Sequence, residues 1–268
     1  MMLTEHPCFS AHAHFRYGRI HLPVAPKCNI RCGYCDRRFD CANESRPGVT
    51  SAVVSPEEAL VRVERALCQD NRLRVVGIAG PGEPLANSAT WETLRLVHQH
   101  FPNLLLCLST NGLTLADHLP ELLDCGISSL TITVNSLSVN SAKHIYQAVA
   151  GSTEIDAIST FLATQQEGAA KAVAAGVAVK INTVVIPGVN TDEIEEIARW
   201  GGRVGVSIMN LMPLIPQAAF QGVSPPSQSL LCDLRNRAGV YVSQFTHCRQ
   251  CRADAAGVPG EPEGAYYR

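Results

Sequence analysis

The sequence predicts an α/β fold in which six parallel strands curl into a partial barrel, with extensions at both ends. Short apolar runs alternate with helical patterns along the 268 residues, as expected for parallel strands joined by right-handed helical crossovers. The runs are apolar at nearly every position, which is typical of strands that are covered on both faces. Six repeats are too few for a closed barrel of eight strands, so a TIM-like (β/α)6 partial barrel is the expected fold.

The first predicted strand, residues 20–25, leads directly into a loop that contains three cysteines. Residues 37–49 are polar and contain Gly and Pro, so we expect a loop there. At Ser55 the sequence Ser-Pro-Glu-Glu is a capping box with proline at the first helical position. A helix is therefore predicted to begin there and to end near Gln69.

The remaining elements alternate in the same way. Apolar runs predict five further strands, at residues 74–79, 104–109, 130–134, 177–186 and 206–211. Helices are predicted at residues 91–99, at 115–124, in a long region that is interrupted near 151 and ends near 175, and from about 190 to 200. A Pro- and Gly-rich loop, a short helix at 229–238 and a strand-like segment at 240–245 are expected to follow.

The length and composition fit one domain, with an arm at 1–19, the partial barrel at 20–211, and a lid loop and C-terminal extension at 212–268. A net charge of −2 gives no electrostatic reason to expect nucleic acid or a membrane surface as a partner. No apolar run is long enough to span a bilayer. Residues 1–14 carry His, Cys and charge where a signal peptide would need an apolar core, so we expect a cytoplasmic protein.

Eleven cysteines in such a chain indicate metal binding or redox chemistry. Three of them, Cys28, Cys32 and Cys35, are spaced Cys-x3-Cys-x2-Cys after the first strand. A four-iron cluster ordinarily has four thiolate ligands, so three close cysteines predict a cluster with one iron left open. The alternative is a structural zinc site, which usually needs a second pair of Cys or His ligands.

Tyr34 stands directly before the third cysteine, and the resulting pattern resembles the signature of the radical S-adenosylmethionine (SAM) superfamily. Further polar groups follow the predicted strands. In residues 80–84, Gly-Pro-Gly-Glu-Pro, the glycines permit close approach of a ligand and Glu83 can accept hydrogen bonds from an ammonium group. Ser109, Thr110 and Asn111 end the third strand and can bind a ribose or a carboxylate. For both segments an ordinary turn is the alternative.

The other cysteines fall into two groups. Cys68, Cys125 and Cys232 lie in or at the end of predicted helices, where a free cysteine usually packs as a small core residue. The second group lies on predicted loops or strand ends and includes a Cys-x2-Cys pair, which is typical of a metal or redox site; its members are Cys8, Cys41, Cys107, Cys248 and Cys251.

Four of the nine histidines are compared as possible ligands. His21 lies on the first strand, where it is either a core histidine or a ligand that points into the barrel. His12, His14 and His247 are expected to be solvated.

Longer segments resemble the NifB family of radical SAM enzymes, which make the carbide-containing precursor of the nitrogenase cofactor. The resemblance rests on the segments His-Pro-Cys, RIHLPVAPKCNIRCGYC, DCANESRPGV, VVGIAGPGEPLAN, LCLSTNG, TITVN, NLMPLIP and HCRQCRADAAG. It covers nearly the whole chain and corresponds to the stand-alone form without a C-terminal carrier-like domain. Residues 146–155 depart from it, because a more aromatic and basic loop is expected there.

The resemblance implies three [4Fe–4S] clusters. Cys28, Cys32 and Cys35 would hold the cluster that binds SAM. Contacts to this cofactor are expected from Tyr34, Gly80, Gly82, Glu83, Ser109, Thr110, Asn111 and Asn135. Two further clusters, the substrates, would be bound by Cys8, His21, Cys41, Cys107, Cys248 and Cys251. The resemblance leaves open how these ligands divide between the two clusters.

The implied reaction uses two SAM molecules. One donates a methyl group to a sulfide of a substrate cluster, and the other yields a 5′-deoxyadenosyl radical that removes hydrogen from that methyl. Insertion of a sulfur completes an eight-iron core. Glu44, Arg46 and Asn182 are candidates for proton handling or positioning, with loop hydrogen bonding as the alternative. The expected partners are an iron–sulfur cluster donor, an electron donor and a downstream carrier or scaffold, and the chain is expected to act as a monomer.

Two other functions compete with this interpretation. A radical SAM enzyme that modifies a peptide or small molecule would keep the first cluster and the Cys-x2-Cys pair, but has no reason for Cys8, His21, Cys41 and Cys107. An electron-transfer or zinc-binding protein would need neither the Gly-Pro-Gly-Glu-Pro segment nor the barrel pattern.

Overall fold

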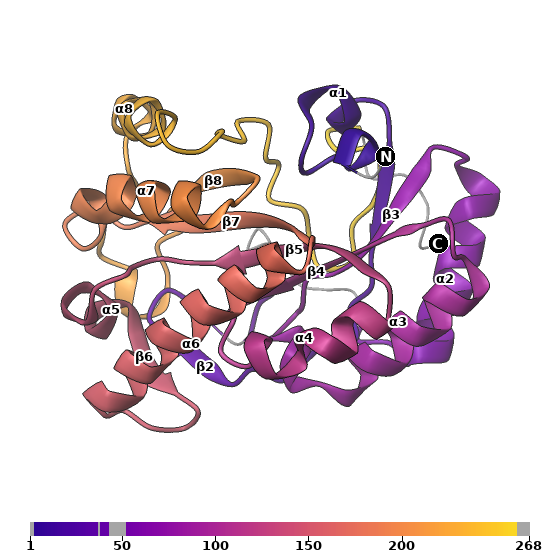
Figure 1. Cartoon of the computed structure of the whole chain (residues 1–268), viewed down its shortest axis with the longest axis horizontal. Helices are drawn as coiled ribbons and strands as arrows, with labels where there is room; N and C mark the ends of the chain where they lie inside the picture. The colour runs from indigo at the N-terminus through magenta and orange to yellow at the C-terminus, as the bar shows by residue number, and fades with distance from the viewer. Residues whose placement is uncertain (1–2, 37, 43–51, 262–268) are drawn as a thin grey trace.

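A computed structural model describes residues 3–36, 38–42 and 52–261 (Figure 1). Its main sheet has the strand order β8-β7-β5-β4-β3-β1-β9. Six of these strands run parallel, and they are β1 (Gly18–His21), β3 (Leu73–Ile78), β4 (Leu105–Thr110), β5 (Ile127–Thr133), β7 (Ala178–Val185) and β8 (Ile208–Pro213). They correspond to the six predicted strands, and the α/β class is confirmed. Strand β9 (Ala256–Gly257) joins β1 antiparallel and was not predicted.

Helices connect the parallel strands and cover the sheet. They are α2 (Pro56–Gln69), α3 (Ser88–His100), α4 (Leu115–Asp124), α6 (Ile155–Ala174), α7 (Ile194–Val204) and α8 (Gln228–Ala238), with the shorter α1 (Ala11–His14) and α5 (Val139–Ile145). The predicted capping box is present, because Ser55 Oγ accepts from the amide of Glu58 while the Glu58 carboxylate accepts from the amide of Ser55. The predicted helix that ends before Gly126 is also present. Gly126 has φ of 76°, which favours glycine at this helix end.

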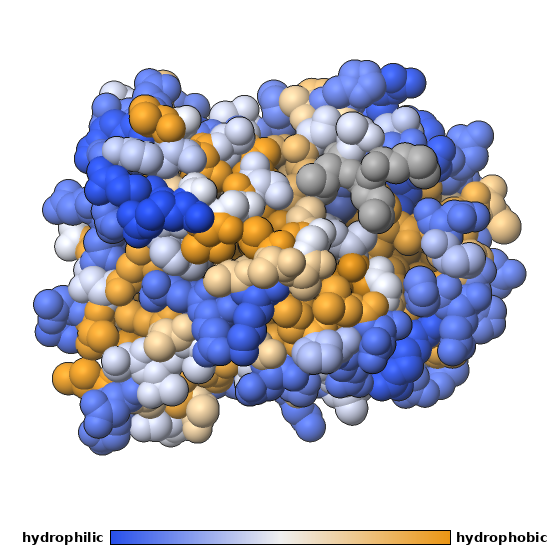
Figure 2. Space-filling view, in the orientation of Figure 1, coloured by the Kyte–Doolittle hydropathy of each residue, from blue (hydrophilic) through white to orange (hydrophobic). Residues whose placement is uncertain are grey.

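The apolar core lies between the sheet and these helices, and leucine, isoleucine and valine from the strands supply most of it. A second apolar cluster surrounds the cysteine loop and includes Tyr34, Tyr146, Phe161 and Phe220. Figure 2 shows hydrophilic residues around the edge of the viewed face and hydrophobic residues nearer its middle. Within the described residues, no helix is both long and apolar enough to cross a membrane.

The long helical region predicted up to residue 175 is interrupted near residue 151, as expected, but a strand that was not predicted precedes that point. Residues Tyr146–Val149 form β6, which pairs antiparallel with β2 (Ile30–Cys32) in the cysteine loop. The pairing supplies backbone hydrogen bonds that a helix would otherwise provide, so tertiary contact overrides the local helical pattern. Strand β6 therefore covers the side of the cysteine loop where the family resemblance departs.

The two ends of the described chain also differ from expectation. The strand-like segment 240–245 forms only a single bridge between Met209 and Gln244. The N-terminal arm packs on residues 245–261, called here the C-terminal segment. The ring centroid of His14 in the arm is 5.7 Å from that of Phe245. Figure 1 shows these indigo and yellow segments next to each other above the sheet.

Candidate active site

The concave side of the sheet carries two rows of functional side chains. Neighbouring strands align His21 with Gly77, Gly77 with Cys107, and Cys107 with Ser129. One row nearer the carboxyl ends, Ser109 aligns with Thr131 and Thr131 with Lys180. Side chains alternate between the two faces of a strand, so Cys107 and Ser109 on β4 share the inner face.

Two hollows open on this side. The first, the loop pocket, has a volume of about 370 Å³ including space open to solvent, and it is lined by Cys28, Ile30, Arg31, Cys32, Cys35, Cys41, Gly82, Glu83 and Asn111. It brings together the three cysteines of the loop and three of the predicted SAM contacts, Gly82, Glu83 and Asn111. It also contains Cys41, which the resemblance assigns to the substrate clusters.

The Gly-Pro-Gly-Glu-Pro segment packs directly on the start of the cysteine loop. The amide of Gly82 donates to the carbonyl of Ala25 at 2.6 Å, and the amide of Glu83 donates to the carbonyl of Lys27 at 2.8 Å. A Cβ on Gly82 would lie 2.3 Å from the carbonyl oxygen of Lys27. Glycine is therefore required for this approach of the two segments.

Asn87 stabilises the same loop through hydrogen bonds. It was not predicted as a site residue from the sequence. Its Nδ2 donates to the carbonyls of Lys27 and Glu83, and its Oδ1 accepts from the amide of Lys27 at 3.0 Å. Its only sequence signal is its place at the end of the Gly-Pro-Gly-Glu-Pro-Leu-Ala-Asn segment.

The carboxylate of Glu83 is buried and joins this segment to the end of β4. Oε1 accepts from the hydroxyl of Thr110 at 2.6 Å and from the amide of Leu85 at 3.1 Å. Oε2 accepts from the amide of Asn111 at 2.7 Å. Glu83 and Thr110 thus hold the pocket wall in place, and Glu83 lines the pocket together with Gly82 and Asn111.

Tyr34 and Asn135, both predicted as cofactor contacts, lie together beneath the loop. Asn135 Nδ2 donates to the Tyr34 hydroxyl at 2.7 Å, and its Oδ1 accepts from the amide of Val184 at 2.8 Å. Both residues are buried. In this arrangement they fix the loop to strands β5 and β7.

The chemistry of the pocket's donor set fits an iron–sulfur cluster. A hydrogen bond with Cys35 and then burial raise the pKa of Cys32, and the same two causes raise the pKa of Cys41. Burial disfavours the negatively charged thiolate form of these neighbouring thiols. They become thiolate ligands when the positive charge of a bound metal compensates for that cost. Within the described residues, no three Cys, His, Asp or Glu side chains form a single-ion site.

The second hollow, the sheet cavity, lies on the inner face of the sheet and has a volume of about 580 Å³ including open space. It brings together five of the six ligands expected for the substrate clusters, and these are Cys8, His21, Cys107, Cys248 and Cys251. They come from the N-terminal arm, β1, β4 and the C-terminal segment. Lys180, His6 and His14 also line it.

Burial dominates the electrostatics of this cavity. It raises the pKa of Cys8 to about 12, against the opposing effect of the Lys180 charge. Burial likewise raises the pKa of Cys248. Burial and the charge of Arg19 lower the pKa of His21 to about 4, so its ring is neutral near pH 7. A neutral imidazole is the form that binds a metal.

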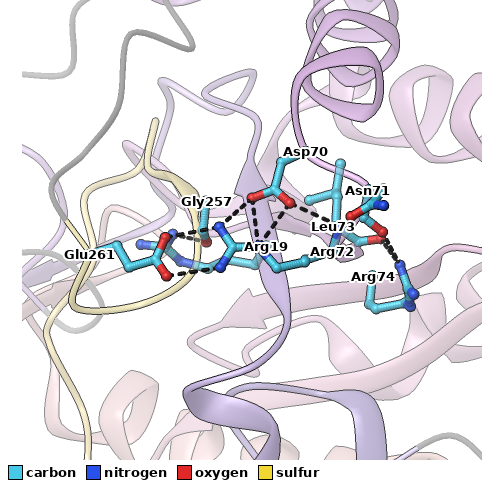
Figure 3. A network of polar contacts seen from close by, with 8 residues as sticks. All are labelled: Arg19, Asp70, Asn71, Arg72, Leu73, Arg74, Gly257 and Glu261. Atoms are coloured by element: carbon cyan, nitrogen blue, oxygen red, sulfur yellow. Dashed lines mark hydrogen bonds and ion pairs between the residues drawn. The ribbon is translucent and has the colours of Figure 1, made fainter.

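The C-terminal segment is fastened to the edge of the sheet, and this places Cys248 and Cys251. The amide of His21 donates to the carbonyl of Ala255 at 2.8 Å, and Arg19 Nη1 donates to the carbonyl of Gly257 at 2.6 Å. Beyond them, the Arg72 guanidinium lies between the carboxylates of Asp70 and Glu261 (Figure 3).

Comparisons with known proteins identify the family of this chain. The radical SAM superfamily profile matches residues 22–201. The NifB protein of Klebsiella pneumoniae is 46% identical over 96% of this chain and 58% of its own length. That of Methanocaldococcus infernus is 38% identical over 98% of this chain and 88% of its own length. This chain belongs to the NifB family of radical SAM proteins.

The NifB relatives differ in length. The chain spans 58% and 63% of the NifB proteins of Klebsiella pneumoniae and Chlorobaculum tepidum. Among solved structures, Streptococcus suis SuiB bound to S-adenosylmethionine has a TM-score of 0.64 at 13% identity, covering 85% of this chain and 50% of SuiB. A radical SAM methyltransferase from Sphaerobacter thermophilus has a TM-score of 0.58 at 18% identity, over 85% of this chain and 64% of that protein. These likenesses show the radical SAM fold.

Several predicted residues of this NifB-family chain lie elsewhere than expected. Ser109 lines the sheet cavity and not the loop pocket. Asn182 is buried on β7, where its Oδ1 accepts from Asn210 Nδ2 at 3.1 Å. Gly80 packs beside Ala25, whose amide donates to its carbonyl at 3.3 Å. Glu44 and Arg46 lie outside the described residues.

The predictions for the remaining Cys and His residues are partly wrong. Cys125 is buried as expected, but Cys68 and Cys232 are exposed because they lie on the outer faces of α2 and α8. His12 is exposed, whereas His14 is buried because the C-terminal segment packs over α1. His6 was not identified as a site residue, and Lys180 was expected only as one of the polar groups that the predicted strands bring to one face of the sheet. The alternation of side chains along residues 177–186 could have placed Lys180 on the inner face.

Proposed function

We propose that this chain carries the radical SAM activity of nitrogenase cofactor biosynthesis. It would join two [4Fe–4S] substrate clusters, a carbon from SAM and one added sulfur into an eight-iron precursor. The observation that supports this most directly is the shared wall of the two hollows. On β4 and just beyond it, Cys107 and Ser109 line the sheet cavity, and Asn111, two residues later, lines the loop pocket.

In this proposal Cys28, Cys32 and Cys35 hold the [4Fe–4S] cluster that binds SAM. When bound, that cluster supplies the electron that splits SAM into methionine and a 5′-deoxyadenosyl radical. The backbone around Gly82 and the side chain of Asn111 orient SAM. Glu83, Asn87 and Asn135 keep the pocket walls rigid through the hydrogen bonds described above, so that the reactive carbon is held toward the sheet cavity.

The iron–sulfur substrates are held by the thiols of the sheet cavity and by His21. Cys41 is placed to contact a substrate at the boundary of the loop pocket. A substrate that must fuse with another and then leave is best held by few protein ligands. The five proposed ligands of the sheet cavity come from four separate segments of the chain. Burial of the cavity excludes water from reactive intermediates.

The proposal also names partners and a compartment. Free cysteines in this number call for a reducing compartment such as the cytoplasm. The reaction consumes iron–sulfur clusters and electrons and yields a product that a carrier or scaffold must accept. We propose that the chain performs the reaction as a monomer.

The deciding experiment uses protein reconstituted with iron and sulfide, reduced, and given SAM without any other substrate. Both S-adenosylhomocysteine and 5′-deoxyadenosine should form, because the substrate is bound to the enzyme itself. A Cys248→Ala variant should keep the SAM-binding cluster and lose the eight-iron product, whereas the exposed Cys68→Ala variant should behave as the wild type. Formation of neither SAM product by the wild type would contradict the proposal.

A further inference from the structure

Backbone contacts determine where the protons lie on the three histidines of the sheet cavity. Nδ1 of His14 is 3.0 Å from the carbonyl oxygen of Pro7, and Nδ1 of His21 is 2.9 Å from that of Arg252. A carbonyl can only accept, so Nδ1 carries the hydrogen in both rings. The neutral form of each ring then has a bare Nε2 with a lone pair, which is suited to bind iron.

His6 has the opposite arrangement. Its Nδ1 is 3.0 Å from the amide nitrogen of Cys8, and an amide N–H can only donate. Nδ1 must therefore be bare, and the hydrogen of the neutral ring lies on Nε2. A cationic ring is incompatible with this contact because it would carry a hydrogen on both nitrogens.

The Nε2–H group of His6 is buried and has no hydrogen-bond partner within the described part of the chain. The ring is 2% exposed and lines the sheet cavity beside Cys8. It is held in place by an edge-to-face contact with Phe9, at 4.8 Å between ring centroids, and by the hydrogen bond from Cys8. Buried donors in native structures normally have partners, so this one indicates an acceptor in the occupant of the cavity.

The sulfide and thiolate sulfurs of an iron–sulfur cluster are acceptors, whereas a nitrogen that carries hydrogen has no lone pair for iron. Resting on the function proposed above, we propose that His6 is a positioning residue that donates a hydrogen bond from Nε2 to a sulfur of the iron–sulfur substrate held beside Cys8. His21, with its bare Nε2, remains the nitrogen ligand. The two histidines thus recognise the sulfur and the iron of the same substrate.

This role has a measurable consequence. Hydrogen bonds to the sulfurs of a cluster raise its reduction potential, because they stabilise the additional negative charge of the reduced form. They also hold a cluster without adding a thiolate that must later be released. Loss of the His6 donor should therefore lower the potential of the cluster in the sheet cavity and weaken its retention.

The test uses the full chain with Cys28, Cys32 and Cys35 changed to Ala, so that the loop pocket contributes no cluster signal. The protein is reconstituted with ferrous iron and sulfide alone and titrated with reductant under electron paramagnetic resonance. His6→Phe keeps a ring without a donor, and His6→Gln keeps an N–H near the position of Nε2. His12→Phe, on the exposed side of α1, is the matched control.

We expect His6→Phe to shift the potential downward or to lose cavity iron, while His6→Gln and His12→Phe stay near the wild type. An unchanged reduction potential and iron content in His6→Phe overturns the proposal for His6. The proposal is also overturned if His6→Gln shows the same loss as His6→Phe. Strong nitrogen hyperfine coupling that disappears only in His6→Phe would show that His6 is itself an iron ligand, and this would also overturn the proposal. Cavity iron without SAM turnover in the wild type would contradict only the proposed function, and absence of cavity iron would contradict both.

Discussion

Gly77 leaves the space that the ring of His21 occupies. A Cβ on Gly77 would lie 3.0 Å from Cδ2 and 3.5 Å from Nε2 of His21. The two residues are neighbours in the register of β1 and β3, and Cys107 is the next neighbour on β4. Gly77 therefore lets an imidazole lie across the sheet toward a thiol of the sheet cavity.

The change Gly77→Ala should displace the His21 ring. Overpacking of this kind costs about 1–3 kcal/mol of stability, and the displaced ring should also reduce the iron bound in the sheet cavity. Urea unfolding and iron analysis measure the two effects. Gly222→Ala is the control, because a Cβ there has no atom within 4 Å. Normal iron binding by Gly77→Ala would show that the position of the ring is not decisive.

The second prediction concerns the buried carboxylate of Glu83. In Glu83→Gln an amide NH2 replaces one oxygen and faces donors from Thr110, Leu85 or Asn111. One buried donor is then left without an acceptor, which should lower the free energy of unfolding by about 2–3 kcal/mol and weaken SAM binding. Urea unfolding and equilibrium dialysis of SAM test this. The exposed Glu64→Gln variant should show neither change, and tight SAM binding by Glu83→Gln would contradict the role given to the carboxylate.

The fold could be predicted because its strands are continuous apolar runs that need no distant information. The parallel order then places the residues after each run at one edge of the sheet, which is why the Gly-Pro-Gly-Glu-Pro segment and the end of β4 could be assigned to one site. Strand β6 could not be predicted, because its partner β2 lies more than a hundred residues earlier in the chain.

The contacts between side chains from distant parts of the chain also could not be predicted from the sequence. Cys41 follows the cysteine loop, but only the structure places it against Cys35. His14 was expected to be solvated, but it packs against Phe245 and His247, which are more than two hundred residues away in the sequence. Glu83 has the residue type of a ligand-binding group, and only the structure shows that its carboxylate also accepts hydrogen bonds from Thr110 and Asn111 in the pocket wall.

The third prediction concerns the attachment of the C-terminal segment. Arg72 and Glu261 form a two-bond ion pair with both N···O distances at 2.9 Å (Figure 3), and their side chains are 42% and 48% exposed. An exposed pair contributes at most about 1 kcal/mol. Glu261→Gln should therefore leave global stability nearly unchanged and should speed hydrogen exchange at residues 255–258. Glu121→Gln, which breaks a similar surface pair with Arg95, is the control.

The same ion pair predicts a pH dependence. The hydrogen bond with Arg72 lowers the pKa of Glu261 below its usual value. A carboxyl with a lowered pKa contributes stability above its unfolded pKa, and that contribution is lost as the pH falls through the folded pKa. The small difference in unfolding free energy between wild type and Glu261→Gln should thus be present at pH 7, decline as the pH falls below the unfolded pKa of about 4.3, and vanish below the folded pKa. A difference that grows on acidification would contradict the assignment.

The last prediction concerns the one lysine in the lining of the sheet cavity. Lys180 is 4% exposed, and its charge acts on both Cys8 and Cys248. A four-iron cluster with thiolate ligands is an anion, and burying an anion is unfavourable unless a cation offsets its charge. Lys180→Met keeps the length of the side chain and removes that cation. Iron retained in the sheet cavity should therefore fall several-fold, while the cluster of the loop pocket remains.

Iron analysis of the reconstituted variants, with and without the loop cysteines, separates the two sites. Lys171→Met is the matched control, because Lys171 is exposed on α6 and pairs with Glu167. Lys180→Arg keeps the charge in a larger group, so it should retain more iron than Lys180→Met if charge is the decisive property. Equal iron in Lys180→Met and in the wild type would show that the charge of Lys180 is not needed to hold the substrate.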